Sequence, residues 1–273
     1  MTRVLRRGAL FLGLTGLLLP VYLAVLPFGA RRRVAALWFS GCCDILGIAL
    51  RVSGRPSEAA GTLYVANHAS YLDILVLGRL LDAAFVAKAE VARWPLFGII
   101  AHLGGTVFVS RRRAAAGKES ERMAARLSGG ERLVLFPEGT SSDGNRVLPF
   151  RSGLFAATEG RRMVQPVSLA YTRHGDGRPL AAEDRPAFSW FGDMELLPHL
   201  IGVLGRDGVE VEVLFHPPVA ASAFADRKTL AGRCEATVGG GLDDLLAGRR
   251  RGAALLPGER PVEPCTSGIY AIG

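Results

Sequence analysis

A single uncharged run near the N-terminus limits what this chain can fold into more than any other feature. Residues 8–28 read GALFLGLTGLLLPVYLAVLPF and contain no charged side chain. As a helix, this run would extend about 32 Å, enough to cross the hydrocarbon core of a bilayer, with a kink at Pro20. A signal peptide has a shorter apolar region and small residues before its cleavage site, a pattern that Phe28 does not fit. We therefore expect a membrane anchor, with a signal peptide or a buried core helix as the alternatives.

A second apolar segment, residues 34–50, follows the arginine triplet at 31–33. It is shorter and contains Asp44, and an unpaired carboxylate in hydrocarbon is costly. We expect this segment to lie at the membrane interface or to pair with the first run as a hairpin. A hairpin that enters one leaflet would keep both arginine groups on the cytoplasmic side. The sequence thus predicts a membrane-associated two-helix segment over residues 1–60, at the cytoplasmic (inner) membrane of a bacterium.

The charge distribution favours lipid over nucleic acid as the partner of this basic chain. The formal net charge is +8, and residues 1–60 hold eight arginines against only Asp44 and Glu58. Basic clusters beside apolar runs favour anionic lipid, whereas nucleic-acid binders interleave basic and aromatic residues. We therefore expect membrane lipids and no nucleic acid as partners. The four cysteines and five histidines lack metal-ligand spacing, so no metal site is expected.

From residue 61 onward, short apolar runs alternate with helical stretches, which predicts an α/β domain over 61–250 with a largely parallel sheet flanked by helices. A strand at 209–215 alternates Val and Glu, which places it near an edge or a partly open face. Residues 251–273 are rich in Gly and Pro and are expected to form a loose tail. The other expected strands are 62–66, 84–87, 106–110, 132–136 and 164–170, and the expected helices are 71–81, 91–101, 114–128, 152–160, 194–204 and 222–247.

A histidine and an aspartate follow the first expected strand, in the sequence Asn67-His68-Ala69-Ser70-Tyr71-Leu72-Asp73. In one continuous helix they would lie about 140° apart and could not meet. They meet if His68 lies in the loop and Asp73 in the first helical turn. A histidine oriented by a carboxylate is a general base. The alternative is that Ser70 and Asp73 form a capping box at the start of the helix.

A second polar loop, Phe136-Pro137-Glu138-Gly139-Thr140, follows another apolar strand. Gly139 permits a tight turn whose backbone N–H groups would bind an anion, and Glu138 would accept a hydrogen bond from a polyol. The alternative is an ordinary turn at a strand end. Two arginines with forked donors suited to phosphate, Arg111 and Arg151, complete the set of candidate residues.

Taken together, these motifs resemble the glycerolipid acyltransferase family, which includes the 1-acylglycerol-3-phosphate acyltransferases. The family block N-H-x-x-x-x-D matches Asn67 to Asp73, and the block F-P-E-G-T matches Phe136 to Thr140. A strand ending in arginine matches Gly105 to Arg111, the apolar-proline-apolar strand matches Val164 to Val167, and Phe150 to Gly153 resembles F-[KR]-x-G. The blocks come in family order over roughly residues 60–220.

The resemblance implies a membrane-bound O-acyltransferase without a cofactor. His68, oriented by Asp73, would take a proton from the hydroxyl of a lysolipid, which would attack the thioester of acyl-CoA or acyl carrier protein on the cytoplasmic side. No acyl-enzyme and no metal are implied. The residues that would bind the substrate are Asn67, Arg111, Glu138, Gly139, Thr140 and Arg151.

Two departures from the family pattern bear on the acceptor. Ser110 precedes Arg111 where many relatives have Asp, and Ser141 stands where many phosphatidic-acid-forming members have Arg. The stretch 190–199 also resembles bacterial relatives that acylate lyso-ornithine lipid. We expect lysophosphatidic acid as the acceptor first and lyso-ornithine lipid second. A non-catalytic membrane scaffold is the alternative from another class.

Overall fold

The computed structural model describes residues 1–28, 31–93, 97–109, 113–158 and 162–249. The expected loose tail at 251–273 lies outside the described residues.

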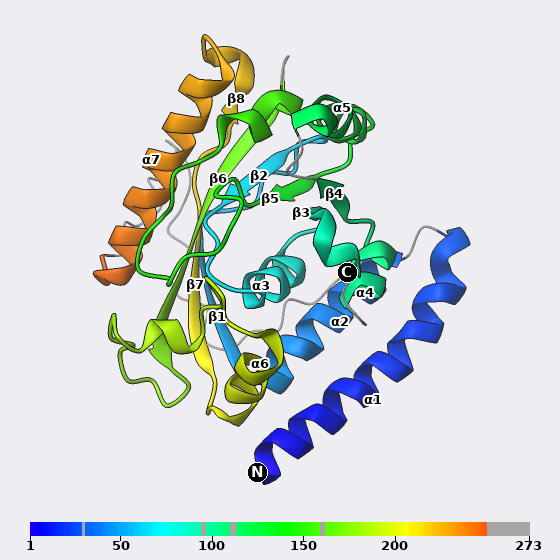
Figure 1. The fold of residues 1–273 in the computed structure, drawn as a ribbon, viewed down its shortest axis with the longest axis vertical. Coiled ribbons are helices and arrows are strands. Elements are labelled where there is room, and N and C mark those ends of the chain that lie inside the picture. The colour runs from blue at the N-terminus through cyan, green and yellow to red at the C-terminus, as the bar shows by residue number, and fades with distance from the viewer. Residues whose placement is uncertain (29–30, 94–96, 110–112, 159–161, 250–273) are drawn as a thin grey trace, which may run out of the picture.

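One eight-stranded sheet forms the centre of the molecule (Figure 1). Its strands follow the order β1-β7-β6-β2-β5-β3-β4, and β8 pairs with β6. All pairings are parallel except those of β6 with β7 and with β8. The expected α/β fold with a largely parallel sheet is confirmed. The strands are β1 (Ile48–Ser53), β2 (Leu63–Ala66), β3 (Ala84–Lys88), β4 (Val107–Val109), β5 (Leu133–Leu135), β6 (Met163–His174), β7 (Val209–Phe215) and β8 (Val219–Ala220).

Helices cover both faces of this sheet, as the continuous burial of β2 requires. One core layer joins the sheet to α2, α3 and α6, and the other joins it to α5 and α7. The α-helices are α1 (Thr2–Val25), α2 (Arg31–Leu46), α3 (Leu72–Leu80), α4 (Phe97–Leu103), α5 (Arg113–Ser128), α6 (Leu196–Gly205) and α7 (Arg227–Leu246). Short 3₁₀ helices are η1 (Leu26–Phe28), η2 (Ala89–Arg93), η3 (Ser152–Thr158), η4 (Arg185–Ala187) and η5 (Ala221–Ala223).

The expectation of two apolar membrane-anchoring helices is corrected to one. Among the described residues only α1 is long and apolar enough to cross a membrane. Helix α2 instead packs on α3, with Cys42 and Cys43 fully buried. The carboxylate of Asp44 accepts a hydrogen bond from Arg79 of α3 at 2.6 Å. The charge that disfavours this segment in hydrocarbon is therefore paired within the protein.

The second apolar segment also supplies a strand. Gly47 adopts a positive φ of 73°, which ends α2, and Ile48–Ser53 then form β1, the edge strand parallel to β7. The sheet therefore begins before residue 60, and β7 lies next to the edge. Glu210 of β7 forms an ion pair with Arg51 of β1 at 2.6 Å, whereas Glu212 is buried.

Three expected helices are shorter or tighter than predicted. The expected helix 152–160 is a 3₁₀ helix over Ser152–Thr158. The expected helix 222–247 begins only at Arg227, because Asp226 accepts a hydrogen bond from the backbone N–H of Thr229 at 2.8 Å and caps it. The expected helix 91–101 is divided between η2 and α4, on either side of residues 94–96.

Candidate active site

The histidine and aspartate of the first motif meet in the loop between β2 and α3. His68 Nδ1 lies 2.8 Å from Asp73 Oδ2. The same oxygen accepts hydrogen bonds from the backbone N–H groups of Ala69 at 2.7 Å and Ser70 at 2.9 Å. Parallel strands direct the loops at their carboxyl ends toward a common site, and this loop occupies such a position. Asp73 therefore orients the imidazole and holds the loop that carries it.

The structure contains one of the two hydrogen bonds of the capping-box alternative: Asp73 accepts from the backbone N–H of Ser70, but the N–H of Asp73 bonds the Ser70 carbonyl at 3.0 Å and not the Ser70 hydroxyl. Helix α3 has Tyr71 at its N-cap position and no side-chain hydrogen bond there. Asp73 bonds backbone N–H groups ahead of the helix, so its carboxylate shapes the turn while it also contacts the histidine.

The other oxygen of Asp73 is held from the sheet. The hydroxyl of Tyr171 on β6 donates to Asp73 Oδ1 at 2.6 Å. Both side chains are 1% exposed, and burial beside this carboxylate raises the pKa of Tyr171 well above its usual value. Tyr171 therefore stays a neutral donor, and Asp73 is fixed on both oxygens.

The imidazole of His68 is exposed on one side and supported on the other. Its ring stacks on Phe136 with centroids 4.1 Å apart, and its side chain is 20% exposed. Because Nδ1 faces Asp73, the acceptor nitrogen left for a substrate proton is Nε2. This is the arrangement that a general base requires.

The two motif loops are joined by hydrogen bonds to the backbone of His68. Its N–H donates to Glu138 Oε1 at 2.7 Å, and its carbonyl accepts from the backbone N–H of Ser142 at 2.8 Å. Glu138 Oε2 accepts from the N–H of Leu148 at 2.9 Å. Glu138 is 2% exposed, and this burial raises its pKa to about 8. In this structure its carboxyl group holds the loops around His68.

Gly139 and Arg151 lie against each other beside Glu138. Gly139 has a φ of 66°, and a Cβ placed there would come 2.9 Å from Arg151 Nε. Arg151 is exposed, and its backbone N–H donates to the carbonyl of Pro137 at 2.9 Å. Thr140 next to them is half-buried. Arg151 therefore places a positive charge next to Gly139, on the loop whose Glu138 bonds the backbone of His68.

Of two further predicted site residues, one is buried and the other lies outside the described residues. Asn67 is buried, and its side chain both donates to the carbonyl of Leu169 at 2.9 Å and accepts from its N–H at 2.8 Å. Asn67 thereby continues the pairing of β2 with β6 up to His68. Arg111 lies outside the described residues, two positions after the end of β4 at Val109.

Sequence reasoning missed Tyr171 and the role of the segment around Trp190. The backbone N–H of Trp190 donates to the carbonyl of Ala69 at 2.8 Å, and the hydroxyl of Ser141 donates to the carbonyl of Trp190. The Trp190 ring also meets Tyr71 edge to face, with centroids 6.3 Å apart. The sequence offered a tyrosine on a buried strand and the resemblance of the stretch 190–199 to relatives that acylate lyso-ornithine lipid, and neither pointed to these contacts.

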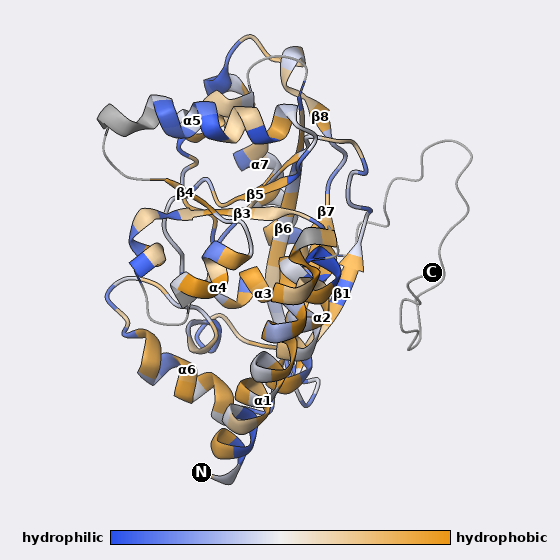
Figure 2. Ribbon diagram, turned by 90° about the vertical axis from the view of Figure 1, so that its right-hand side faces the viewer, coloured by the Kyte–Doolittle hydropathy of each residue, from blue (hydrophilic) through white to orange (hydrophobic). Residues whose placement is uncertain are grey.

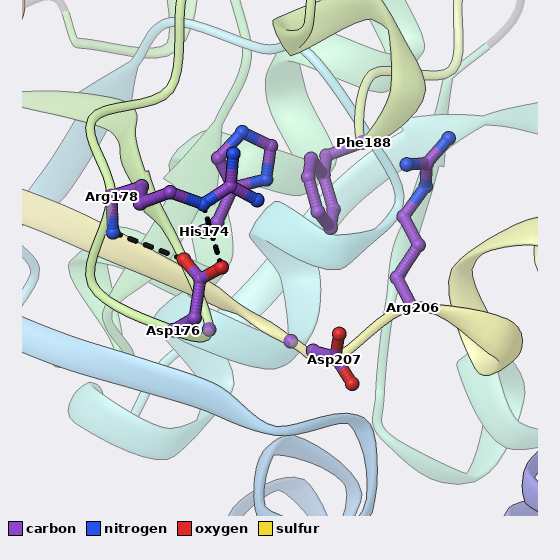
Figure 3. A pocket seen from close by; sticks show the side chains of 8 residues that line it. His174, Asp176, Arg178, Phe188, Arg206 and Asp207 are labelled. Carbon is purple, nitrogen blue, oxygen red and sulfur yellow. Dashed lines mark hydrogen bonds and ion pairs between the residues drawn. The ribbon is translucent and has the colours of Figure 1, made fainter.

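A separate cavity of about 260 Å³ lies at the junction of β6, α6 and β7 (Figure 3). Its charged side chains are engaged within the protein: Asp176 pairs with Arg178 at 2.7 Å, and Arg206 lies over the ring of Phe188. His68 and Asp73 do not line it. The candidate active site is therefore the pair of loops around His68.

Comparison with known proteins identifies the family of this chain. A family model described as Acyltransferase matches residues 49–170, a range that contains His68, Asp73 and Glu138. A lyso-ornithine lipid O-acyltransferase from Brucella abortus is 42% identical over 230 residues, which are 81% of this chain and 86% of that protein. The chain belongs to the acyltransferase family. It is a lysolipid acyltransferase.

Two more relatives place this acyltransferase within the family. A 1-acyl-sn-glycerol-3-phosphate acyltransferase from Neisseria gonorrhoeae is 30% identical over 78% of this chain and 81% of its own length. The crystal structure of the 1-acyl-sn-glycerophosphate acyltransferase from Thermotoga maritima has a TM-score of 0.61 and 23% identity, covering 90% of this chain and 98% of that one. The acyltransferase therefore shares its α/β fold with a solved member.

Proposed function

We propose that this acyltransferase moves a fatty acyl group from acyl-CoA or acyl carrier protein to the hydroxyl of lyso-ornithine lipid. The observation that carries the chemistry is the 2.8 Å contact of His68 with Asp73, which leaves Nε2 facing outward as a base. A scaffold would not need a histidine held in this manner.

In the proposed reaction, His68 Nε2 takes the proton of the acceptor hydroxyl while its oxygen attacks the thioester carbon. A carbon–oxygen bond forms, the carbon–sulfur bond breaks, and the proton passes from His68 to the leaving thiolate. Asp73 stabilises the imidazolium that forms in between, and its four hydrogen bonds hold the carboxylate in place. No acyl-enzyme is formed, and the two substrates are the only reactants.

The choice of acceptor rests on similarity and on Ser141. The relative named for lyso-ornithine lipid is more similar than the one named for 1-acyl-sn-glycerol-3-phosphate, at 42% against 30% identity. The Ser141 hydroxyl is engaged with the carbonyl of Trp190 and offers no positive charge. A lipid without phosphate has less need of a cation at that position, whereas a doubly charged phosphate favours one.

Lysophosphatidic acid is the second candidate acceptor, and Arg151 favours it. This guanidinium is exposed and lies against Gly139 in the loop that holds His68. An exposed arginine fork on this loop suits a phosphate group.

The proposed location is the cytoplasmic membrane of a bacterium, with the active site on the cytoplasmic side. The support is α1, an apolar helix of which only a small share is buried in the protein. A lysolipid acceptor is itself a membrane component, so a membrane-associated enzyme meets its substrate where it resides.

The test is acyl transfer by the detergent-solubilised protein from acyl-CoA and from acyl carrier protein, with both lysolipids offered in parallel. We expect product from lyso-ornithine lipid that is lost in His68→Ala. Product from lysophosphatidic acid alone would overturn the acceptor but keep the mechanism. Equal activity of His68→Ala and the unmodified protein would overturn the mechanism.

A further inference from the structure

The exposed large apolar side chains of this protein are gathered on one set of helices. Among the described residues, all of these side chains except Val52 on β1 lie on α1 with its N-cap and its turn η1, on α2, on α4, or on α6 and the residues just before it, where Met194 stands. Soluble proteins rarely expose large contiguous apolar patches without a partner. The most exposed members away from the chain end are Phe28, Leu17, Leu12, Leu197 and Ile99.

Helix α1 is fastened to the domain at both ends. Near its start, Arg7 is 7% exposed and donates to the carbonyls of Leu204 at 3.2 Å and Arg206 at 2.6 Å, at the end of α6. Near its other end, the hydroxyl of Tyr22 donates to the carbonyl of Leu103, the last residue of α4. The helix therefore lies along the molecule between α6 and α4, and its free face points outward (Figure 1).

Helices α1 and α6, both rich in apolar residues, are neighbours at one end of the molecule (Figure 2). Leu197 and Ile201 lie one turn apart on α6 and are 66% and 48% exposed. Ile99 on α4 is 60% exposed near the opposite end of α1. We call the exposed apolar side chains of α1, α4 and α6 the apolar platform.

Exposed arginines flank the apolar platform. Arg6 lies in the first turns of α1, and Arg31 and Arg33 begin α2 just beyond its other end. An apolar face with basic residues at its ends is the pattern of a helix lying in the interface of an anionic bilayer. This charge pattern selects a lipid surface over a protein partner.

The apolar platform is connected to the catalytic loop. His199 of α6 has its Nδ1 3.1 Å from the hydroxyl of Tyr71, which stands between His68 and Asp73 in the chain. The Tyr71 and His199 rings also meet edge to face, with centroids 5.6 Å apart. Helix α6 thus exposes apolar side chains on one side and contacts the catalytic loop through His199.

From these contacts we infer that α4 and α6 join α1 as one membrane-facing surface, seated at the boundary between headgroups and hydrocarbon of an anionic bilayer. This inference rests on the proposed membrane location and extends it: α1 lies in the plane of one leaflet, and α6 brings the catalytic loop to the lipid surface from which the acceptor comes.

The test measures binding of the full-length protein to vesicles of phosphatidylcholine and phosphatidylglycerol, without substrate. The double variant Leu197→Asp with Ile201→Asp should bind at least about tenfold more weakly, since burying one such side chain is worth a factor of this order. Val52→Asp is the matched control, an exposed apolar residue outside the platform, and should bind as the unmodified protein does. Acyl transfer to lyso-ornithine lipid in detergent should persist in both variants, which shows that they fold.

A second measurement does not depend on a destabilising charge. A nitroxide label at Ile201→Cys, in a Cys265→Ser background, should be relaxed by oxygen and shielded from a water-soluble nickel complex when vesicles are present. Cys42, Cys43 and Cys234 are buried and should not take the label. Exposure of the label to nickel on vesicle-bound protein, or undiminished binding of the double aspartate variant, would overturn the inference. If the unmodified protein showed no acyl transfer, the proposed function would be contradicted instead. Failure of the membrane inference and failure of the proposed function are therefore distinguishable.

Discussion

At the scale of single residues, the chemistry depends on which atoms of His68 are already engaged. Nδ1 is held by Asp73 and the ring rests on Phe136, so only one face and one nitrogen remain for a substrate. His68→Ala should lower kcat/KM by about 10²–10⁴-fold, the usual contribution of a general base. Steady-state acyl transfer measures this, with His174→Ala at the separate cavity as the control that should retain activity.

Tyr171 acts through Asp73, which makes it a positioning residue. Removing its hydroxyl in Tyr171→Phe takes away one charge-assisted hydrogen bond, worth about 1.5–3 kcal/mol. We expect kcat to fall about tenfold or more with KM for the acceptor little changed, because the imidazolium of the transition state loses support from a well-held carboxylate. Tyr64→Phe is the matched control: it removes the hydroxyl of an equally buried tyrosine that bonds the carbonyl of Ser57 and not Asp73. A larger loss of kcat in Tyr64→Phe would contradict this role.

The buried carboxyl of Glu138 predicts a pH dependence of stability. Burial raises its pKa from 4.5 to about 8, so between these values the folded protein keeps a proton that the unfolded chain has released. The stability contributed by this group is present below pH 4.5 and is lost as pH rises toward 8. As pH rises across this window, the melting temperature of the unmodified protein should therefore fall relative to that of Glu138→Gln, because the glutamine side chain has no proton to lose there. Melting curves of both proteins over this pH range provide the measurement, and parallel curves would refute the prediction.

At the scale of secondary-structure elements, the sequence predicted most strands and helices because their apolar runs are continuous and their ends carry Gly, Asp or Ser. It did not separate α2 from β1, since residues 34–50 are apolar throughout and only Gly47, with its positive φ, divides them. The spacing of His68 and Asp73 allowed them to meet across a strand-to-helix turn, the family resemblance implied that they do, and the structure shows the contact. Asn67 and Glu138 were expected to bind substrate, whereas their hydrogen bonds to Leu169, His68 and Leu148 arise from strand order and loop contacts that spacing does not encode.

The end of α6 illustrates how one side chain can join two elements. Arg7 places a guanidinium among the last carbonyls of α6, where both hydrogen bonding and the helix dipole favour a positive charge. Arg7→Ala should lower the free energy of unfolding by about 1.5–3 kcal/mol, as expected for a buried charged donor. Urea denaturation monitors this, and Arg6→Ala serves as the control, because Arg6 is exposed on the same helix. Equal effects of the two substitutions would argue against the α1–α6 junction.

At the scale of the whole molecule, the N-terminal segment has two functions that a truncation can separate. Removal of residues 1–28 takes away α1 and η1, whose outer face is exposed, and leaves α2, β1 and the full sheet. Removal of residues 1–52 also takes away α2 and most of β1, including the core residues Cys43, Leu46 and Ile48. We expect the shorter truncation to remain folded in detergent and the longer one to aggregate, because it uncovers β7 and one face of α3.

Vesicle binding by the shorter truncation then measures how much α1 contributes. If α1 carried all membrane affinity, this truncation would stay in solution; with α4 and α6 also at the lipid surface, it should bind more weakly than the full chain but remain sensitive to Leu197→Asp. Circular dichroism and sedimentation with anionic vesicles provide both readouts. A folded truncation that shows no residual binding would assign the membrane contact to α1 alone, and a folded product from the longer truncation would show that β1 is dispensable to the sheet. The architecture argues against both of these results. Helix α1 caps α6 and contacts the end of α4, and β1 completes the edge of the sheet.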